Sequence, residues 1–280
     1  MRARILILAI AAALTAPFAI GAQQSRDLPR VNGPEDPPST FSVIGFDPRT
    51  GEMGAAVQSR VFSVGNGVLW AEANVGVVAT QAIVDVSYGP QAMALLRQGM
   101  APKDIIAQVL ADDPDPRPAT GPADNQVNWS KLGRQFAVMN AKGEFAAHTG
   151  PRASKWAGDK QGKYVTAQGN ILAGEAVVAD MVKAFEDTEK DANGAFQHLS
   201  FRLQAALEAG QAAGGDTRGQ QSAAMIVVKK ECGVWLHNDV VLRLQVDDNP
   251  EPIKELRRLV ELAARQRGRG GERYQRCFGG

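Results

Sequence analysis

The sequence predicts an α+β fold in which two stacked sheets lie between outer layers of helices. Runs that favour strands and runs that favour helices each come in pairs along the chain. A doubly wound parallel sheet would instead show strict alternation of strand and helix. Some strand runs, such as residues 75–82, are apolar on both faces, as expected for a sheet that is covered on both sides.

The first elements form a hairpin followed by two more strands. Residues 40–47 are rich in β-branched and aromatic side chains, and Pro48 to Gly51 has the composition of a turn. A second strand runs from Met53 to Ser59. We expect further strands at 68–71 and 75–82.

Two helices and a loop come next. One helix covers residues 90–97, and another begins at Pro102, a residue suited to the first helical turn. The proline-rich stretch 112–122 is expected to be a surface loop.

The second half repeats this grouping of strands and helices. We expect strands at 135–139, 144–149 and 164–168, and then amphipathic helices at 175–185 and 196–210. Gly214 and Gly215 should end the second of these helices. The remaining elements are strands at 222–228 and 240–246, the latter with Val240, Leu242 and Leu244 on one face, and a helix at 250–264.

The two ends of the chain have other compositions. Arg2 and Arg4 precede a short apolar run, and Gly21-Ala22 suits cleavage, so residues 1–22 have the pattern of a signal peptide. A retained membrane anchor is the alternative. Residues 23–39 are polar and proline-rich and are expected to be a linker. We expect the Arg- and Gly-rich residues 265–280 to be a disordered tail, although they could hold an anionic partner.

The composition limits the partners. A hydrophobic content of 44% and a net charge of +1 are typical of a soluble protein without a field that recruits nucleic acid or anionic lipid. We therefore expect an exported protein, secreted or periplasmic, that binds neither nucleic acid nor, once the leader is removed, a membrane. The composition does not exclude a homo-oligomer. Cys232 and Cys277 could pair, but two unpaired thiols are favoured because Cys277 falls in the expected tail.

The sequence contains no motif for a metal or a cofactor. No Cys/His spacing suits zinc, and no phosphate-binding loop or dinucleotide fingerprint follows a strand. A serine-hydrolase elbow is also missing. We expect neither metal nor cofactor.

Polar clusters at the ends of predicted strands supply candidate site residues. The glycine-rich stretch 214–223 contains Asp216, Arg218 and Ser222 and could form the wall of a site. The alternative is a helix end followed by a loop with an ordinary surface ion pair. Asn170 could donate to a developing oxyanion or could cap the next helix.

Other candidates lie at further strand ends. Arg60, after Ser59, could bind a substrate carboxylate or only cover a sheet edge. Arg134 begins one strand of the second hairpin, and His148 lies near the end of its partner. A lone histidine is more often structural.

Several of these segments together resemble a bacterial family of unknown function that is placed in the N-terminal nucleophile (Ntn) hydrolase superfamily. The resemblance extends from Thr40 to about Ala264 and implies a four-layer αββα sandwich of mostly antiparallel sheets. The segments that carry it are 40–43, 54–60, 70–73, 76–82, 88–90, 134–135, 149–150, 169–170 and 214–223.

The resemblance also implies a function, an exported amidohydrolase acting on a small amide or peptide bond. In such enzymes the hydroxyl of the first residue, here Thr40, attacks the carbonyl, and its own α-amine is the base. Because Ser39 precedes Thr40, this requires a second cleavage. A non-catalytic binding protein with the same fold is the alternative. We expect Thr40, Asn170 and Asp216 in the reaction, and around the substrate Ser59, Arg60, Arg134, His148, Arg218 and Ser222.

Overall fold

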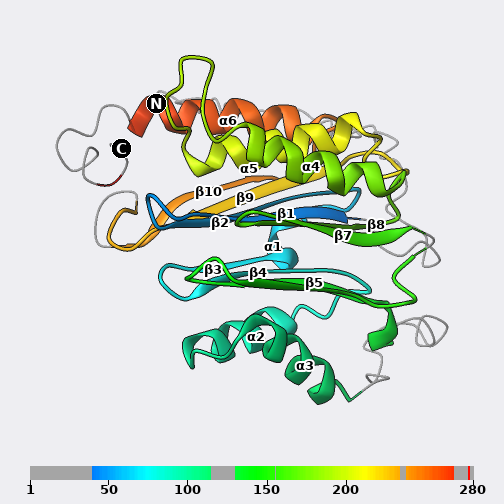
Figure 1. Cartoon of the computed structure of the whole chain (residues 1–280). Helices are drawn as coiled ribbons and strands as arrows, with labels where there is room; N and C mark the ends of the chain where they lie inside the picture. The colour runs from blue at the N-terminus through cyan, green and yellow to red at the C-terminus, as the bar shows by residue number, and fades with distance from the viewer. Residues whose placement is uncertain (1–39, 115–129, 155, 234–237, 268–276, 278–280) are drawn as a thin grey trace, which may run out of the picture. The chain divides into compact units, whose positions relative to one another are not determined.

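The computed structural model describes residues 40–114, 130–154, 156–233, 238–267 and 277. Two antiparallel sheets stack face to face, and helices cover their outer faces (Figure 1). The arrangement is a four-layer αββα sandwich, as the sequence predicts. The expected signal peptide and linker fall on residues 1–39, outside the described residues.

One sheet has six strands in the order β10-β9-β2-β1-β8-β7. The β1–β2 hairpin lies at its centre and pairs with β8 on one side and β9 on the other. Its strands are β1 (Thr40–Asp47), β2 (Glu52–Ser59), β7 (Ala157–Gly162), β8 (Val165–Asn170), β9 (Ser222–Val228) and β10 (Val240–Val246).

The other sheet has four strands in the order β3-β4-β5-β6. Its two central strands are almost wholly buried, which explains why they have no polar face in the sequence. The strands are β3 (Leu69–Glu72), β4 (Gly76–Ala82), β5 (Arg134–Asn140) and β6 (Phe145–Thr149).

The helices divide between the two outer faces. Helices α4 (Glu175–Asp187), α5 (Leu199–Ala212) and α6 (Pro252–Arg267) cover the six-stranded sheet, and α2 (Tyr88–Arg97) and α3 (Pro102–Asp112) cover the four-stranded sheet (Figure 1). The short helix α1 is Gly65–Val68, and a 3₁₀ turn, η2, is Lys131–Gly133. Positive φ angles at Gly214 and Gly215 end α5, as predicted. None of the described helices is both long and apolar enough to cross a membrane.

The sequence missed three elements and misplaced two features. Strand β7, helix α1 and the 3₁₀ turn η2 were not expected. In β10 the register shifts between Val240 and Leu242, so Val240 packs between the sheets whereas Leu242 packs under the helices. The predicted single face is therefore wrong. Helix α6 continues to Arg267, beyond the expected start of the tail at residue 265.

The cysteines also differ from expectation. Cys232 and Cys277 form a disulfide, which corrects the expectation of two free thiols. Cys277 is buried, and its carbonyl accepts a hydrogen bond from Lys229 Nζ. This residue of the expected tail is thus fixed to the β9–β10 connection. The rest of 268–280 lies outside the described residues.

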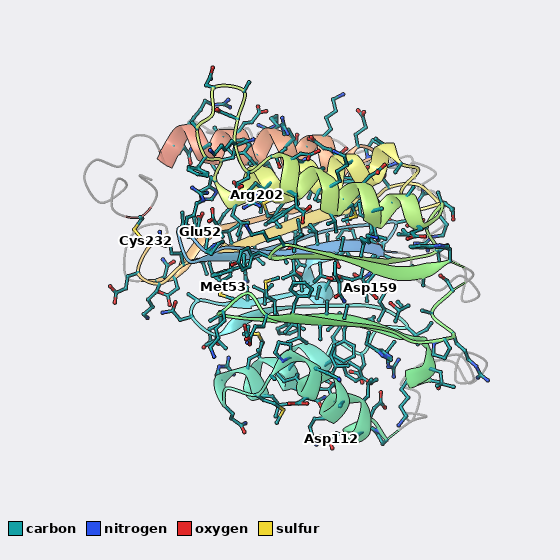
Figure 2. The ribbon with its side chains drawn as sticks, viewed as in Figure 1. Glu52, Met53, Asp112, Asp159, Arg202 and Cys232 are labelled. Atoms are coloured by element: carbon teal, nitrogen blue, oxygen red, sulfur yellow. A yellow bond between two sulfur atoms is a disulfide. The ribbon has the colours of Figure 1, made fainter. Side chains whose placement is uncertain are left out.

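The space between the two sheets, here called the interlayer, changes character along its length. At one end it is apolar, with side chains such as Ile44, Met53, Ala79 and Ile226. Toward the end where β1 begins, the same strand faces carry hydroxyl and amide side chains. Figure 2 shows both ends of the six-stranded sheet, with Glu52 at the apolar end and Asp159 at the polar end. The polar end is the candidate site.

Candidate functional site

Strand register places Thr40 at the polar end of the interlayer. Thr40 begins β1 and lies opposite Ser59 of β2 and Asn170 of β8. Alternate residues of a strand share a face, so Thr40 faces the same way as Ile44, which packs between the sheets. The Thr40 side chain is therefore directed into the sandwich, with only 3% of the residue exposed.

Hydrogen bonds fix both the hydroxyl and the carbonyl of Thr40. Its Oγ1 lies 3.0 Å from Oγ of Ser59. Its carbonyl oxygen accepts hydrogen bonds from Asn170 Nδ2, at 3.3 Å, and from Gln81 Nε2, at 3.4 Å. The first residue of β1 is thus held from both sheets.

A network of buried amides lies behind Thr40 and joins the two sheets. Gln81 Nε2 donates to Gln135 Oε1 at 2.8 Å, and Asn170 Nδ2 donates to the same oxygen at 3.1 Å. Gln81 also accepts from Ser42, whose hydroxyl in turn accepts from Gln168. Buried amides are costly unless they are hydrogen-bonded, and this mutual pairing offsets that cost.

The network affects the role expected for Asn170. An amide nitrogen carries two hydrogens, and those of Asn170 are directed to Thr40 O and Gln135 Oε1. In this geometry Asn170 positions the backbone of Thr40. A backbone N–H is therefore the better candidate for an oxyanion donor.

Thr40 also lines a pocket of about 170 Å³. Gln81 and Ser63 are the other polar residues of its wall. The remaining lining is apolar or glycine. It comes from the β2–β3 connection, from α1 and from the end of β4, and consists of Val61, Phe62, Val64, Gly67, Val68, Ala82 and Val84.

Unusual backbone conformations surround this pocket. Ser63 and Ala82, both in its wall, have φ angles of 54° and 68°, and Ile171, next to Asn170, has 53°. Non-glycine residues rarely adopt such angles, and a β-branched isoleucine is especially disfavoured. Strain of this kind often gathers at functional sites, where the surrounding structure maintains it.

Ser222 supports the wall of the pocket. It lies opposite Ser59 in the β2–β9 register, and its hydroxyl donates to Val61 O at 2.5 Å and accepts from Val64 N at 3.1 Å. The structure thus places Ser222 behind two lining residues, where it holds the β2–β3 connection in position.

Asp216, Arg218 and Arg60 form a second cluster near the same end of β2. Asp216 is buried, and its carboxylate binds the guanidinium of Arg218, with Oδ2 3.0 Å from Nη2. The carbonyl of Arg218 accepts a hydrogen bond from Arg60 Nη1 at 3.1 Å. Within the described parts of the chain no ion pair joins Arg60 to an acidic side chain. None of the three residues lines the Thr40 pocket.

Arg134 and His148 lie elsewhere. Both face the α2–α3 layer, on the far side of the four-stranded sheet from Thr40. Arg134 donates to Ile83 O at 2.5 Å and pairs with the buried Asp113, and the His148 ring packs against Phe136. These contacts give both residues a structural setting, although the sequence suggested that they contact substrate.

Three glutamines received no role from the sequence, although Gln135 and Gln168 stand near the candidates Arg134 and Asn170 at strand ends. All three lie at the polar end of the interlayer, and each has at most 2% of its surface exposed. They are Gln81, Gln135 and Gln168. Their signal was available, because each is a polar residue near the end of a strand. Among the described residues no three His, Cys, Asp or Glu side chains gather as metal ligands would.

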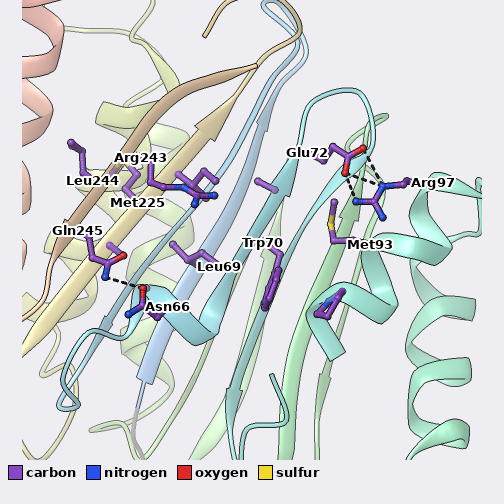
Figure 3. A pocket seen from close by; sticks show the side chains of 15 residues that line it. Asn66, Leu69, Trp70, Glu72, Met93, Arg97, Met225, Arg243, Leu244 and Gln245 are labelled. Atoms are coloured by element: carbon purple, nitrogen blue, oxygen red, sulfur yellow. Dashed lines mark hydrogen bonds and ion pairs between the residues drawn. The ribbon is translucent and has the colours of Figure 1, made fainter. Parts of the chain in front are cut away.

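A larger hollow, of about 330 Å³, lies beside the edge strands β3 and β10 (Figure 3). An ion pair between Glu72 and Arg97 and a hydrogen bond between Gln245 and Asn66 belong to its wall. No candidate residue from the sequence lines this hollow. Of these two hollows, the Thr40 pocket combines a candidate nucleophile with strained backbone.

Comparison with known proteins places the chain in a family. The sequence model of a family of unknown function, DUF1028, matches residues 40–256, which is most of the chain. The chain belongs to this family. Among solved structures it is similar to a crystal structure of another DUF1028 protein, SPO2555 from Silicibacter pomeroyi. That chain is 29% identical, and the match covers 81% of this chain and 86% of that one with a TM-score of 0.66. No curated protein matches.

Proposed function

We propose that this DUF1028 protein is an exported amidohydrolase of the Ntn type, in which Thr40 is the nucleophile for a small amide or peptide bond. The observation that carries the proposal is the setting of the Thr40 hydroxyl. It is held 3.0 Å from Ser59 Oγ, and Thr40 lines a pocket at the polar end of the interlayer.

The chemistry needs Thr40 to be the first residue of the processed chain. A free α-amine has a pKa of about 8, so a useful fraction is neutral and can accept the hydroxyl proton. Thr40 Oγ1 then attacks the amide carbonyl, the leaving amine takes the proton, and an ester to Thr40 forms. Water hydrolyses this ester to release the acid and restore the hydroxyl.

The neighbouring residues have matching roles in this proposal. Ser59 orients the attacking hydroxyl, a backbone N–H stabilises the oxyanion, and Asn170 positions the backbone of Thr40. Arg60 attracts a substrate anion, while Asp216 fixes Arg218 and thereby the carbonyl to which Arg60 binds. The family match begins at residue 40, which supports Thr40 as the natural start of the functional unit.

The disulfide supports export. Disulfides persist in oxidising compartments and are rare in the cytosol. The bond between Cys232 and Cys277 therefore fits a secreted or periplasmic protein, in agreement with the signal-like pattern of residues 1–22.

Mass spectrometry and turnover together test the proposal. Intact-mass analysis of the protein from its own cells should find a chain that begins at Thr40. That form should hydrolyse members of a panel of small amides, and Thr40→Ala should abolish turnover. Thr188→Ala, which removes a half-buried hydroxyl bonded to Ala184 O on α4, is the matched control and should remain active.

A binding protein that has kept only the fold is the second candidate. It is favoured by the peptide bond that joins Ser39 to Thr40 in the full chain, because this bond removes the base. If the mature chain retains Ser39 and the amide panel gives no turnover, the binding function replaces the hydrolase.

A further inference from the structure

The pocket beside Thr40 has an apolar wall, although a polar network lies directly behind it. No charged side chain lines it. The Ser63 hydroxyl is turned to Asp247, at 2.6 Å, and Gln81 Nε2 is bonded within the network. The Thr40 hydroxyl is then the polar group that the pocket offers to a ligand.

The volume limits what the pocket can hold. Because a water molecule occupies about 30 Å³ in the liquid, 170 Å³ has room for about five or six groups of that size. Pockets for whole drug-sized ligands begin at about 300 Å³. The pocket therefore fits one side group of a substrate.

We propose that this pocket binds the acyl side chain of the substrate, and that this side chain is a short, uncharged aliphatic group. After attack the acyl part stays bonded to Thr40 Oγ1, whereas the amine leaves. A pocket that the nucleophile itself lines is the natural place for the part that remains. Phe62, with 62% of its surface exposed, extends the apolar wall toward solvent.

This inference rests on the proposed function, because only an amide that is hydrolysed has an acyl side and an amine side. Its test measures binding and requires no turnover. The mature chain carrying Thr40→Ala is titrated with small amides, and binding is followed by NMR. Acetamide has the shortest acyl chain, isovaleramide adds a branched aliphatic group, and succinamate adds a charge. N-isobutylacetamide carries the same aliphatic group on the amine side.

Isovaleramide should bind most tightly. Burying each additional methylene-sized group tightens binding about fourfold, so the three extra carbons should lower Kd on the order of 50-fold relative to acetamide. Succinamate and N-isobutylacetamide should bind no better than acetamide. Equal binding of isovaleramide and acetamide would overturn the proposal, and so would tighter binding of either of the other two amides.

Filling the pocket provides the second test. Val84 is half-buried in the pocket wall, and Val84→Phe should weaken isovaleramide binding at least tenfold. Val75→Phe, at a half-buried valine in the β3–β4 turn outside the pocket, is the matched control and should bind normally. Thermal melting checks that both variants fold. Unchanged binding in a folded Val84→Phe variant contradicts the proposal even if the enzyme proves active, whereas correct binding with no turnover would contradict only the hydrolase.

Discussion

The hydroxyl of Thr40 lies 3.0 Å from the hydroxyl of Ser59, and the two residues face each other across the central hairpin of the six-stranded sheet. Antiparallel register fixes this relationship, because the β1–β2 turn places the first residue of one strand opposite the last residue of the other. This hydrogen bond holds the two hydroxyl groups together, and either of them can be the donor. Both residues are buried, Thr40 with 3% and Ser59 with 0% of its surface exposed.

Ser59→Ala should therefore lower turnover more than it lowers stability. Losing the orienting hydrogen bond should reduce kcat/KM by about tenfold to hundredfold, with the loss mainly in kcat. The hydrogen bond itself contributes about 1 kcal/mol to stability. Steady-state kinetics and thermal melts measure the two effects.

A buried hydroxyl away from the pocket gives the control. Ser200 is fully buried on α5 and bonded to His198 Nδ1 at 2.8 Å. Ser200→Ala should cost similar stability and leave turnover unchanged. If the two variants show equal turnover, Ser59 does not orient the nucleophile.

The amide network should contribute strongly to stability. Gln135 accepts from Gln81 and Asn170 and donates to Thr149 Oγ1 and Gly169 O, both at 2.9 Å. Gln135→Met keeps the approximate shape but removes one hydrogen-bond partner from each of these buried groups. We expect a loss of about 3 kcal/mol in the free energy of unfolding, measured by chemical denaturation.

An exposed glutamine provides the comparison for this variant. Gln161 lies on the edge strand β7 and makes one exposed hydrogen bond, to Asp159. Gln161→Met should change the free energy of unfolding by less than about 0.5 kcal/mol. A similarly small loss for Gln135→Met would mean that the network adds nothing to stability.

The sequence located the strand ends of the site but could not assign their faces. At the start of β5, Arg134 and Gln135 are neighbours, and a shift of one residue exchanges the faces of a strand. Gln135 faces Thr40, whereas Arg134 faces helices α2 and α3. The following residues, Phe136 to Met139, are apolar on both faces and so give no sign of which face is which.

Specific sequence features explain why some elements were predicted and others were missed. The β1–β2 hairpin was predictable because a β-branched run, a proline-containing turn and a second apolar run follow one another. Strand β7 was not, because as an edge strand it is only half-buried and has the sequence Ala-Gly-Asp-Lys-Gln-Gly. Its pairing with β8 holds it in the sheet without an apolar pattern.

His148 should affect pH-dependent stability but not activity. Burial lowers the pKa of His148 below its ordinary value of 6.5, and Asp159 opposes this in part. The unfolded chain then binds a proton more readily than the folded protein does. The contribution of neutral His148 is therefore present above about pH 6.5 and is lost as the pH falls below it.

His148→Phe should make the decrease in Tm between pH 7 and pH 5 smaller. It should leave kcat/KM within about twofold of the native value, because the ring lies on the other side of the four-stranded sheet from Thr40. Asp159→Asn, which removes the opposing charge, should make the decrease steeper. A tenfold fall in kcat/KM for His148→Phe would return this residue to the substrate site.

The disulfide between Cys232, in the β9–β10 connection, and Cys277 should stabilise the fold by restricting the unfolded chain. Cys232 and Cys277 are 45 residues apart. Closing a loop of this length raises the free energy of the unfolded chain by about 3–4 kcal/mol. Cys277→Ser should lower the free energy of unfolding by this amount under oxidising conditions. Added reductant should destabilise the native protein but have no further effect on Cys277→Ser. If reductant leaves the native Tm unchanged, or if the purified protein contains two titratable thiols, the bond does not contribute to the stability of the mature fold.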